Sequence, residues 1–104
     1  MVKISECEEQ VMICIWRSKD APNLQMALKD ANARFGHEWK PQTVSTFLTR
    51  LVKKGYLRME RKGRYCYYYP EVSLEEYRKE KLRSMVELLF GGDRTRAKEC
   101  LESV

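Results

Sequence analysis

The residues best placed to do chemistry in this chain are basic, and they are concentrated in one segment. Between Lys40 and Pro70 lie eight of the twenty lysines and arginines, against a single acid, Glu60. That segment carries a net charge of +7, whereas the segments before and after it each carry −1. Such a concentration of positive charge predicts a polyanionic partner, and duplex DNA is the leading candidate.

Part of this basic segment has the pattern of a helix with two unlike faces. After Pro41, apolar residues recur at i, i+3, i+4, i+7 and i+8 until Gly55. The opposite face carries hydroxyl and amide side chains, which can hydrogen-bond base edges or phosphates and are small enough to seat the helix in a major groove. From this helix we predict DNA contacts by Lys40, Gln42, Thr43, Ser45, Thr46, Arg50 and Lys53. The alternative is an ordinary solvated helix face.

Two β-prone runs follow, Tyr56 to Arg61 and Arg64 to Tyr69, and they predict a hairpin that turns across Lys62-Gly63. The basic side chains Arg61, Lys62 and Arg64 bracket the turn, and we predict that they contact DNA phosphates. Alternatively, they only keep an edge strand from pairing with other chains. Tyrosines alternate along the second run, so we expect at least one face of the hairpin to pack on the helices as core.

No arrangement of residues suggests catalysis, a metal or a cofactor. His37 is the only histidine, so a two-histidine metal site or a nucleophile-histidine pair cannot form within one chain; we expect it to pack near Trp39. The cysteines have no Cys-x-x-Cys or Cys-x-Cys spacing, and we expect reduced thiols that are mostly buried. We therefore predict no catalytic residues, no metal ligands and a protein that is not an enzyme.

Two further helices are expected before the basic segment. Ser5 and Glu8 form a capping-box pattern that opens a helix from Glu6 to Arg17. A second helix begins after Asn23 and ends at Gly36. Three helices followed by a hairpin are the order of a winged helix-turn-helix, which we assign to residues 1–70 as a DNA-binding domain.

Residues 71–104 lie outside this module. They predict a long helix that ends at Gly91-Gly92 and a short last helix. An amphipathic helix beyond a completed domain needs a partner for its apolar stripe, and a second copy supplies one. We predict a homodimer formed by Leu74, Leu82, Met85, Val86, Leu89 and Phe90. The fold class is thus mainly α with a small β-hairpin (α+β): a winged helix plus C-terminal dimerisation helices.

The chain is expected to work in the cytoplasm without membrane insertion. Its longest apolar run, Val11 to Trp16, is far shorter than the ~20 residues that cross a bilayer. The N-terminus has no secretory pattern.

Several motifs together resemble the penicillinase-repressor family, the BlaI and MecI type of bacterial transcriptional repressor. They are TVSTFLTRLVKKGYL (43–57), RKGRYCYYYP (61–70), VSLEEY (72–77) and FGGD (90–93), and ISECEEQVMICIW (4–16) resembles the family's first helix. The resemblance implies a homodimeric repressor on an inverted-repeat operator, with the helix after Pro41 in the major groove, the wing on the backbone and the C-terminal helices in the dimer. It also implies a sensor protease as a partner.

The resemblance has departures. Lys40 stands where similar proteins often carry a capping Ser or Asp, which exchanges a helix cap for a phosphate contact. The sequence ends at Val104, before the further helix of the antibiotic-resistance repressors; the cleavage segment of that family is not identified in it, and the sequence gives no support for control by β-lactams. Copper-responsive relatives carry paired Cys-x-Cys motifs where this chain has only Cys100.

Two other functions are compatible with the same pattern. The first is a winged-helix module that binds a protein and uses its charge for solubility. The second is a binder of structured RNA, which is less favoured because A-form RNA hides its major groove from a helix.

Overall fold

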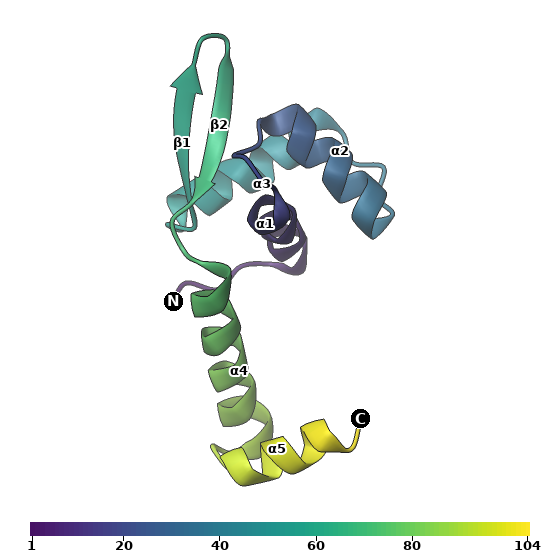
Figure 1. The fold of residues 1–104 in the computed structure, drawn as a ribbon, viewed down its shortest axis with the longest axis vertical. Helices are drawn as coiled ribbons and strands as arrows, with labels where there is room; N and C mark the ends of the chain where they lie inside the picture. The colour runs from purple at the N-terminus through teal and green to yellow at the C-terminus, as the bar shows by residue number, and fades with distance from the viewer. The chain divides into compact units, whose positions relative to one another are not determined.

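Five helices and one two-stranded hairpin follow one another along the chain, as the computed structural model of residues 1–104 shows (Figure 1). The elements are α1 (Glu6–Arg17), α2 (Leu24–Phe35), α3 (Pro41–Lys53), β1 (Leu57–Lys62), β2 (Tyr65–Pro70), α4 (Leu74–Phe90) and α5 (Arg94–Glu102). They form two units, residues 1–73 and 74–104. The expected class, mainly α with a small hairpin, is confirmed.

The first two helices begin and end where local signals place them. The Ser5 hydroxyl accepts the N–H of Glu8, and the Glu8 carboxylate accepts the N–H of Ser5, so the predicted capping box is present. Asn23 caps α2 by accepting the N–H of Met26. Gly36 ends α2 in the left-handed region with φ 69°, where a side chain would be strained.

The core of the first unit lies where α1, α2 and α3 meet the base of the hairpin. Its buried apolar residues are Val11, Met12, Cys14, Ile15, Ala27, Ala31, Val44, Leu48, Leu51, Tyr56 and Leu57. Two hydrogen bonds tie this part of the chain to the helical part. The Tyr68 N–H of β2 donates to the Pro22 carbonyl, in the loop between α1 and α2, at 3.0 Å. The Trp16 indole of α1 donates to the Val72 carbonyl, just after β2, at 2.9 Å. The helices and the hairpin therefore form one packed unit.

The hairpin is shifted by one residue from its predicted position. Lys62 pairs with Tyr65, so the turn is Gly63-Arg64 and the predicted turn at Lys62-Gly63 is wrong. Gly63 has φ 66°, whereas Arg64, like every residue of the chain other than glycine, has a negative φ. This combination fits a type II′ turn, which has glycine in its first central position. The shift places Arg64 on the turn itself.

Only the base of the hairpin is part of the core. Leu57 is buried, but Met59 is 49% exposed and the tyrosines of β2 are half-buried or exposed. The expectation of a packed face is thus met in part: Leu57 is buried, and Tyr68 and Cys66, on the same face of the hairpin, are half-buried. The strands extend beyond the helices, which leaves the rest of the hairpin exposed (Figure 1).

The cysteines are all free thiols, but the expectation that most are buried is wrong, since only Cys14 is. Burial, together with the Asp30 carboxylate, raises the pKa of the Cys14 thiol to about 11. Cys14 is therefore a neutral side chain of the core.

The second unit consists of α4 and α5, and neither helix contains a buried residue. The Gly92 N–H donates to the Val86 carbonyl at 3.0 Å, and Asp93 caps α5 by accepting the N–H of Arg96. None of the helices is both long enough and apolar enough to span a bilayer.

Candidate nucleic-acid interface

The segment that leads into α3 is fixed by hydrogen bonds and ring contacts. The Asn32 amide donates to the Trp39 carbonyl at 3.1 Å and accepts the Trp39 N–H at 3.0 Å. The expected packing of His37 near Trp39 is confirmed: the rings are stacked with centroids 3.9 Å apart, and His37 Nε2 lies 2.6 Å from Gln10 Oε1. Trp39 in turn meets the Phe47 ring of α3 edge-on at 5.1 Å. The N-terminal end of α3 is therefore held by α1 and α2.

The C-terminal end of α3 is attached to the start of the chain. Lys54 Nζ lies 2.8 Å from Glu8 Oε1 of α1. Two residues later the buried Tyr56 donates its hydroxyl proton to the Val2 carbonyl. With both ends attached, α3 is a rigid support for whatever its outer face contacts.

The outer face of α3 is the one that the sequence predicts. Val44, Leu48 and Leu51 point into the core and are completely buried. Thr43 and Ser45 are half-buried, while the remaining predicted contact residues of the helix are exposed: Lys40, Gln42, Thr46, Arg50 and Lys53. The face is thus accessible, and its contacts with DNA stay a prediction.

The threonine hydroxyls of this face already use their protons within the helix. Thr46 Oγ1 donates to the Gln42 carbonyl at 3.0 Å, and Thr49 Oγ1 donates to the Ser45 carbonyl at 2.9 Å. Each hydroxyl oxygen keeps lone pairs, so Thr46 can accept a hydrogen bond from the amino group of adenine or cytosine in a major groove. Its methyl group can contact the methyl of thymine.

The eight basic residues of the segment divide into paired and unpaired ones. Lys54 binds Glu8, and Arg58 lies 3.3 Å from Glu60 and 3.0 Å from Glu71, so carboxylates neutralise both charges. The basic residues that are exposed and make no hydrogen bond or ion pair within the chain are Lys40, Arg50, Lys53 and Arg64. These four are the most available for phosphates.

The two remaining basic residues, Arg61 and Lys62, make hydrogen bonds within the hairpin. Arg61 Nε donates to the Gly63 carbonyl at 3.2 Å. Lys62 Nζ donates to the Tyr69 hydroxyl at 2.7 Å and lies 5.9 Å from the centre of the Tyr67 ring. That hydrogen bond raises the pKa of Lys62. Basic side chains therefore lie over the Tyr67 and Tyr69 rings, Arg58 over Tyr69 included. Tyr65, on the same face, is 50% exposed.

The predicted dimer residues lie in the second unit with unequal exposure. Leu82, Met85 and Leu89 are 59%, 44% and 65% exposed. Leu74, Val86 and Phe90 are half-buried within the single chain. Leu88, 80% exposed, was not among the predicted residues; it lies three residues after Met85, at the edge of the predicted stripe.

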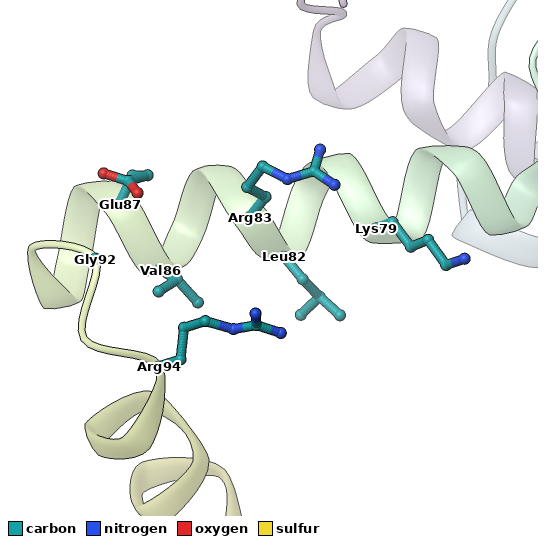
Figure 2. Close-up of a pocket in the computed structure, with 7 residues that line it drawn as sticks. All are labelled: Lys79, Leu82, Arg83, Val86, Glu87, Gly92 and Arg94. Atoms are coloured by element: carbon teal, nitrogen blue, oxygen red, sulfur yellow. The ribbon is translucent and has the colours of Figure 1, made fainter.

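A cavity of about 400 Å³ lies between α4 and α5 (Figure 2). Leu82 and Val86 of α4 form its apolar wall, and the side chain of Arg94 at the start of α5 extends along that wall (Figure 2). Lys79, Arg83, Glu87 and Gly92 complete the lining. Two residues of the predicted dimer stripe, Leu82 and Val86, thus also line this cavity.

Comparison with known proteins gives concordant results. The sequence profile of the penicillinase repressor family matches residues 4–99. The chain is 31% identical over 90 residues to the penicillinase repressor of Bacillus licheniformis, covering 86% of this chain and 68% of that protein. It is 26% identical over 90 residues to the methicillin resistance regulatory protein MecI of Staphylococcus aureus (strain N315), covering 86% and 71%.

Two solved structures are similar at 33% identity. One is the DNA-binding domain of the repressor BlaI, with a TM-score of 0.61 over 72% of this chain and 88% of that chain. The other is the monomeric form of Bacillus licheniformis BlaI in complex with the blaP half-operator, with a TM-score of 0.59 over 73% and 89%. The expected winged-helix fold is confirmed, and the relatives are transcriptional repressors. This chain belongs to the penicillinase repressor family.

Proposed function

We propose that this protein is a transcriptional repressor that binds an inverted-repeat operator in duplex DNA as a homodimer. Residues 1–70 form the DNA-binding domain and residues 71–104 the dimerisation region. The observation that carries the proposal is the accessible polar face of α3. The same unit also has four exposed basic residues without a partner in the chain, Lys40, Arg50, Lys53 and Arg64. The half-operator complex of the similar monomeric BlaI supports the DNA-binding part of the proposal.

In this proposal α3 enters the major groove. Gln42, Thr43, Ser45 and Thr46 read base edges. Phosphates are bound by Lys40, Arg50, Lys53, Arg61, Lys62 and Arg64, with the last three on the wing. If each protomer neutralises about four or five phosphates, the logarithm of the binding constant of a dimer falls with the logarithm of salt concentration with a slope of about −7 to −9.

The size of the second unit supports the proposed dimer. It spans residues 74–104 and contains no buried residue in either helix. Below about 40 residues a chain segment usually needs a disulfide, a metal or another copy to stay folded. A second copy supplies the missing apolar contacts. It covers the exposed side chains of Leu82, Met85 and Leu89, and it fills the cavity that Val86 and Arg94 line (Figure 2).

Repression needs only occupancy of the operator, so the proposal includes no catalytic residue, cofactor or metal. A protein that acts on chromosomal DNA in a bacterium works in the cytoplasm. The sensor protease that the family resemblance implies stays a prediction.

Gel retardation tests the function directly. The probes are duplex DNA from the region upstream of the gene, an unrelated duplex of the same length, and RNA of the upstream sequence. We expect the upstream duplex to be retarded at a protein concentration at least tenfold lower than the other two. Equal and weak retardation of both duplexes would indicate a protein-binding module instead, and preferential retardation of the RNA would indicate an RNA binder.

A further inference from the structure

Glu8 is the one charged residue in the core of this protein. Its side chain is 1% exposed, and it belongs to the first turn of α1, whose other buried residues are apolar. One carboxylate oxygen, Oε1, accepts the Ser5 N–H at 2.7 Å and a proton of Lys54 Nζ at 2.8 Å. The same carboxylate therefore caps α1 and holds the residue that follows α3.

The second carboxylate oxygen, Oε2, is buried and has no hydrogen-bond partner. Burial raises the pKa of Glu8, but the hydrogen bonds from Lys54 and Ser5 lower it by more, so that the pKa lies below its ordinary value of 4.5. Glu8 is thus a buried anion at neutral pH, and a buried anion is tolerated only beside a cation. This fixes Lys54 in an inward position.

Adjacent lysines consequently have opposite surroundings. Lys53, the last residue of α3, is exposed and has no partner in the chain. The side chain of Lys54, the C-cap residue, is only 30% exposed and is directed at α1. The sequence alone does not show which of the two lysines is paired within the protein and which is available for phosphate.

We propose that Glu8 and Lys54 form a positioning pair that sets the orientation of α3 for base readout, and that Lys54 does not contact phosphate. This inference rests on the proposed function and adds a specificity-determining contact remote from the bases. At 1.5 Å per residue, Lys54 lies about 12 Å along the helix from Thr46. The pair acts through the helix rather than by touching DNA.

The two kinds of DNA contact differ in how much displacement they tolerate. Hydrogen bonds from short side chains to base edges need donor and acceptor at about 2.7 to 3.2 Å, so a binding constellation must be held to about 0.5 Å. Long, flexible lysine and arginine side chains follow a phosphate through larger shifts. Loss of the pair should therefore weaken specific binding and leave nonspecific binding unchanged.

The test starts with the full-length wild-type protein and the duplex that it selects from a random-sequence library. Dissociation constants for this duplex and for an unrelated one are then measured over a range of salt concentrations. The variants are Lys54→Met, Lys54→Arg and, as the matched control, Lys53→Met. All are measured at a temperature where circular dichroism shows that they are folded.

We expect Lys54→Met to bind the selected duplex about tenfold more weakly and the unrelated duplex as before, with an unchanged salt slope. Lys54→Arg, which keeps the positive charge, should retain the wild-type preference for the selected duplex. Lys53→Met should weaken both duplexes alike and flatten the slope by about one per site. Glu8→Gln should reproduce Lys54→Met, and the double variant should be no worse than either single one, because each change removes the same ion pair.

A folded Lys54→Met protein that keeps the full preference for the selected duplex would overturn the inference. So would a Lys54→Met protein that behaves like Lys53→Met, because Lys54 would then be a phosphate contact. In both cases the proposed function would survive. A wild-type protein that selects no sequence would overturn the proposed function together with this inference.

Discussion

Thr46 carries the most direct test of base readout at the scale of single residues. Valine has the shape of threonine but no hydroxyl, so Thr46→Val keeps the methyl contact and removes the hydrogen-bond acceptor. We expect a loss of about 0.5 to 1.5 kcal/mol per half-site on the selected duplex and little change on unrelated DNA. Competition binding with both duplexes measures the difference.

Arg64→Ala is the control for Thr46→Val, because Arg64 lies on the exposed turn of the wing and has no partner in the chain. It should weaken all DNA similarly and flatten the salt slope by about one unit per site. If Thr46→Val weakened both duplexes equally, Thr46 would have no part in base readout.

Glu8 gives a prediction for the pH dependence of folding. Because its pKa in the folded protein lies below 4.5, the unfolded chain binds a proton more readily than the folded one as the pH falls. The stabilisation by the charged carboxylate is complete above pH 4.5 and is lost as the pH falls through the lower pKa of the folded protein.

Urea unfolding of the wild type and Glu8→Gln from pH 7 to pH 3 measures this loss. The wild type should be the more stable protein at pH 7, and the difference should shrink toward pH 3. The other carboxylates cancel in the comparison. A difference that stayed constant over the whole range would show that Glu8 is not stabilised as an anion.

The residue scale is also where sequence reasoning was least complete. The Ser5-Glu8 capping box could be predicted, because its partners are three residues apart and the geometry is local. The contact of Glu8 with Lys54 could not, since it joins residues 46 apart and depends on how α1 and α3 pack. The same holds for Arg58, whose charge is neutralised by Glu71 across the hairpin.

At the scale of elements, the start of α3 combines a missing cap with a free cation. Lys40 has the extended backbone of an N-cap residue but makes no capping hydrogen bond. Lys40→Ser should supply the cap and stabilise the domain by about 1 kcal/mol, which corresponds to a rise in Tm of about 4 to 8 °C. It should also weaken binding to any DNA, because a phosphate contact is lost.

Lys40→Ala separates these two effects. It removes the same charge without adding a hydroxyl, so it should lose DNA affinity as Lys40→Ser does and gain no stability. Thermal melting and salt-dependent binding of both variants are the measurements. If neither variant lost affinity for DNA, Lys40 would not contact a phosphate.

The helices were well predicted from the sequence because their boundaries depend on local signals such as Asn23 and Gly36. The hairpin was placed one residue too early, since a single glycine fits either central position of a two-residue turn and only the pairing of Lys62 with Tyr65 decides between them. That Tyr68 and Cys66 are half-buried rather than fully buried was missed for a related reason. Periodicity shows that two faces exist, but not how far the strands extend beyond the helices.

At the scale of the whole molecule, the dimer is the part of the proposal with the clearest requirement. Leu89→Asp places a charge on the 65% exposed stripe residue of α4, where a second copy would have to bury it. We expect monomers in sedimentation velocity and the loss of most operator affinity, because the two half-sites would then be bound independently.

Leu88→Asp is the matched control for the position of the interface. Leu88 is even more exposed but is not one of the predicted contact residues. It lies about 100° around the helix from Leu89, so this variant should remain a dimer. A Leu89→Asp protein that stayed dimeric, or a Leu88→Asp protein that dissociated, would show that a different face of α4 forms the dimer.

A hydroxyl-radical footprint of the wild-type protein on its selected duplex tests the central claim, a symmetric pair of winged helices on one operator, most directly. We predict two protected regions related by a twofold axis, with centres separated by a whole number of helical turns, about 10 base pairs or a multiple of it. A single protected region at saturating protein, or uniform protection along the entire duplex, would contradict the account.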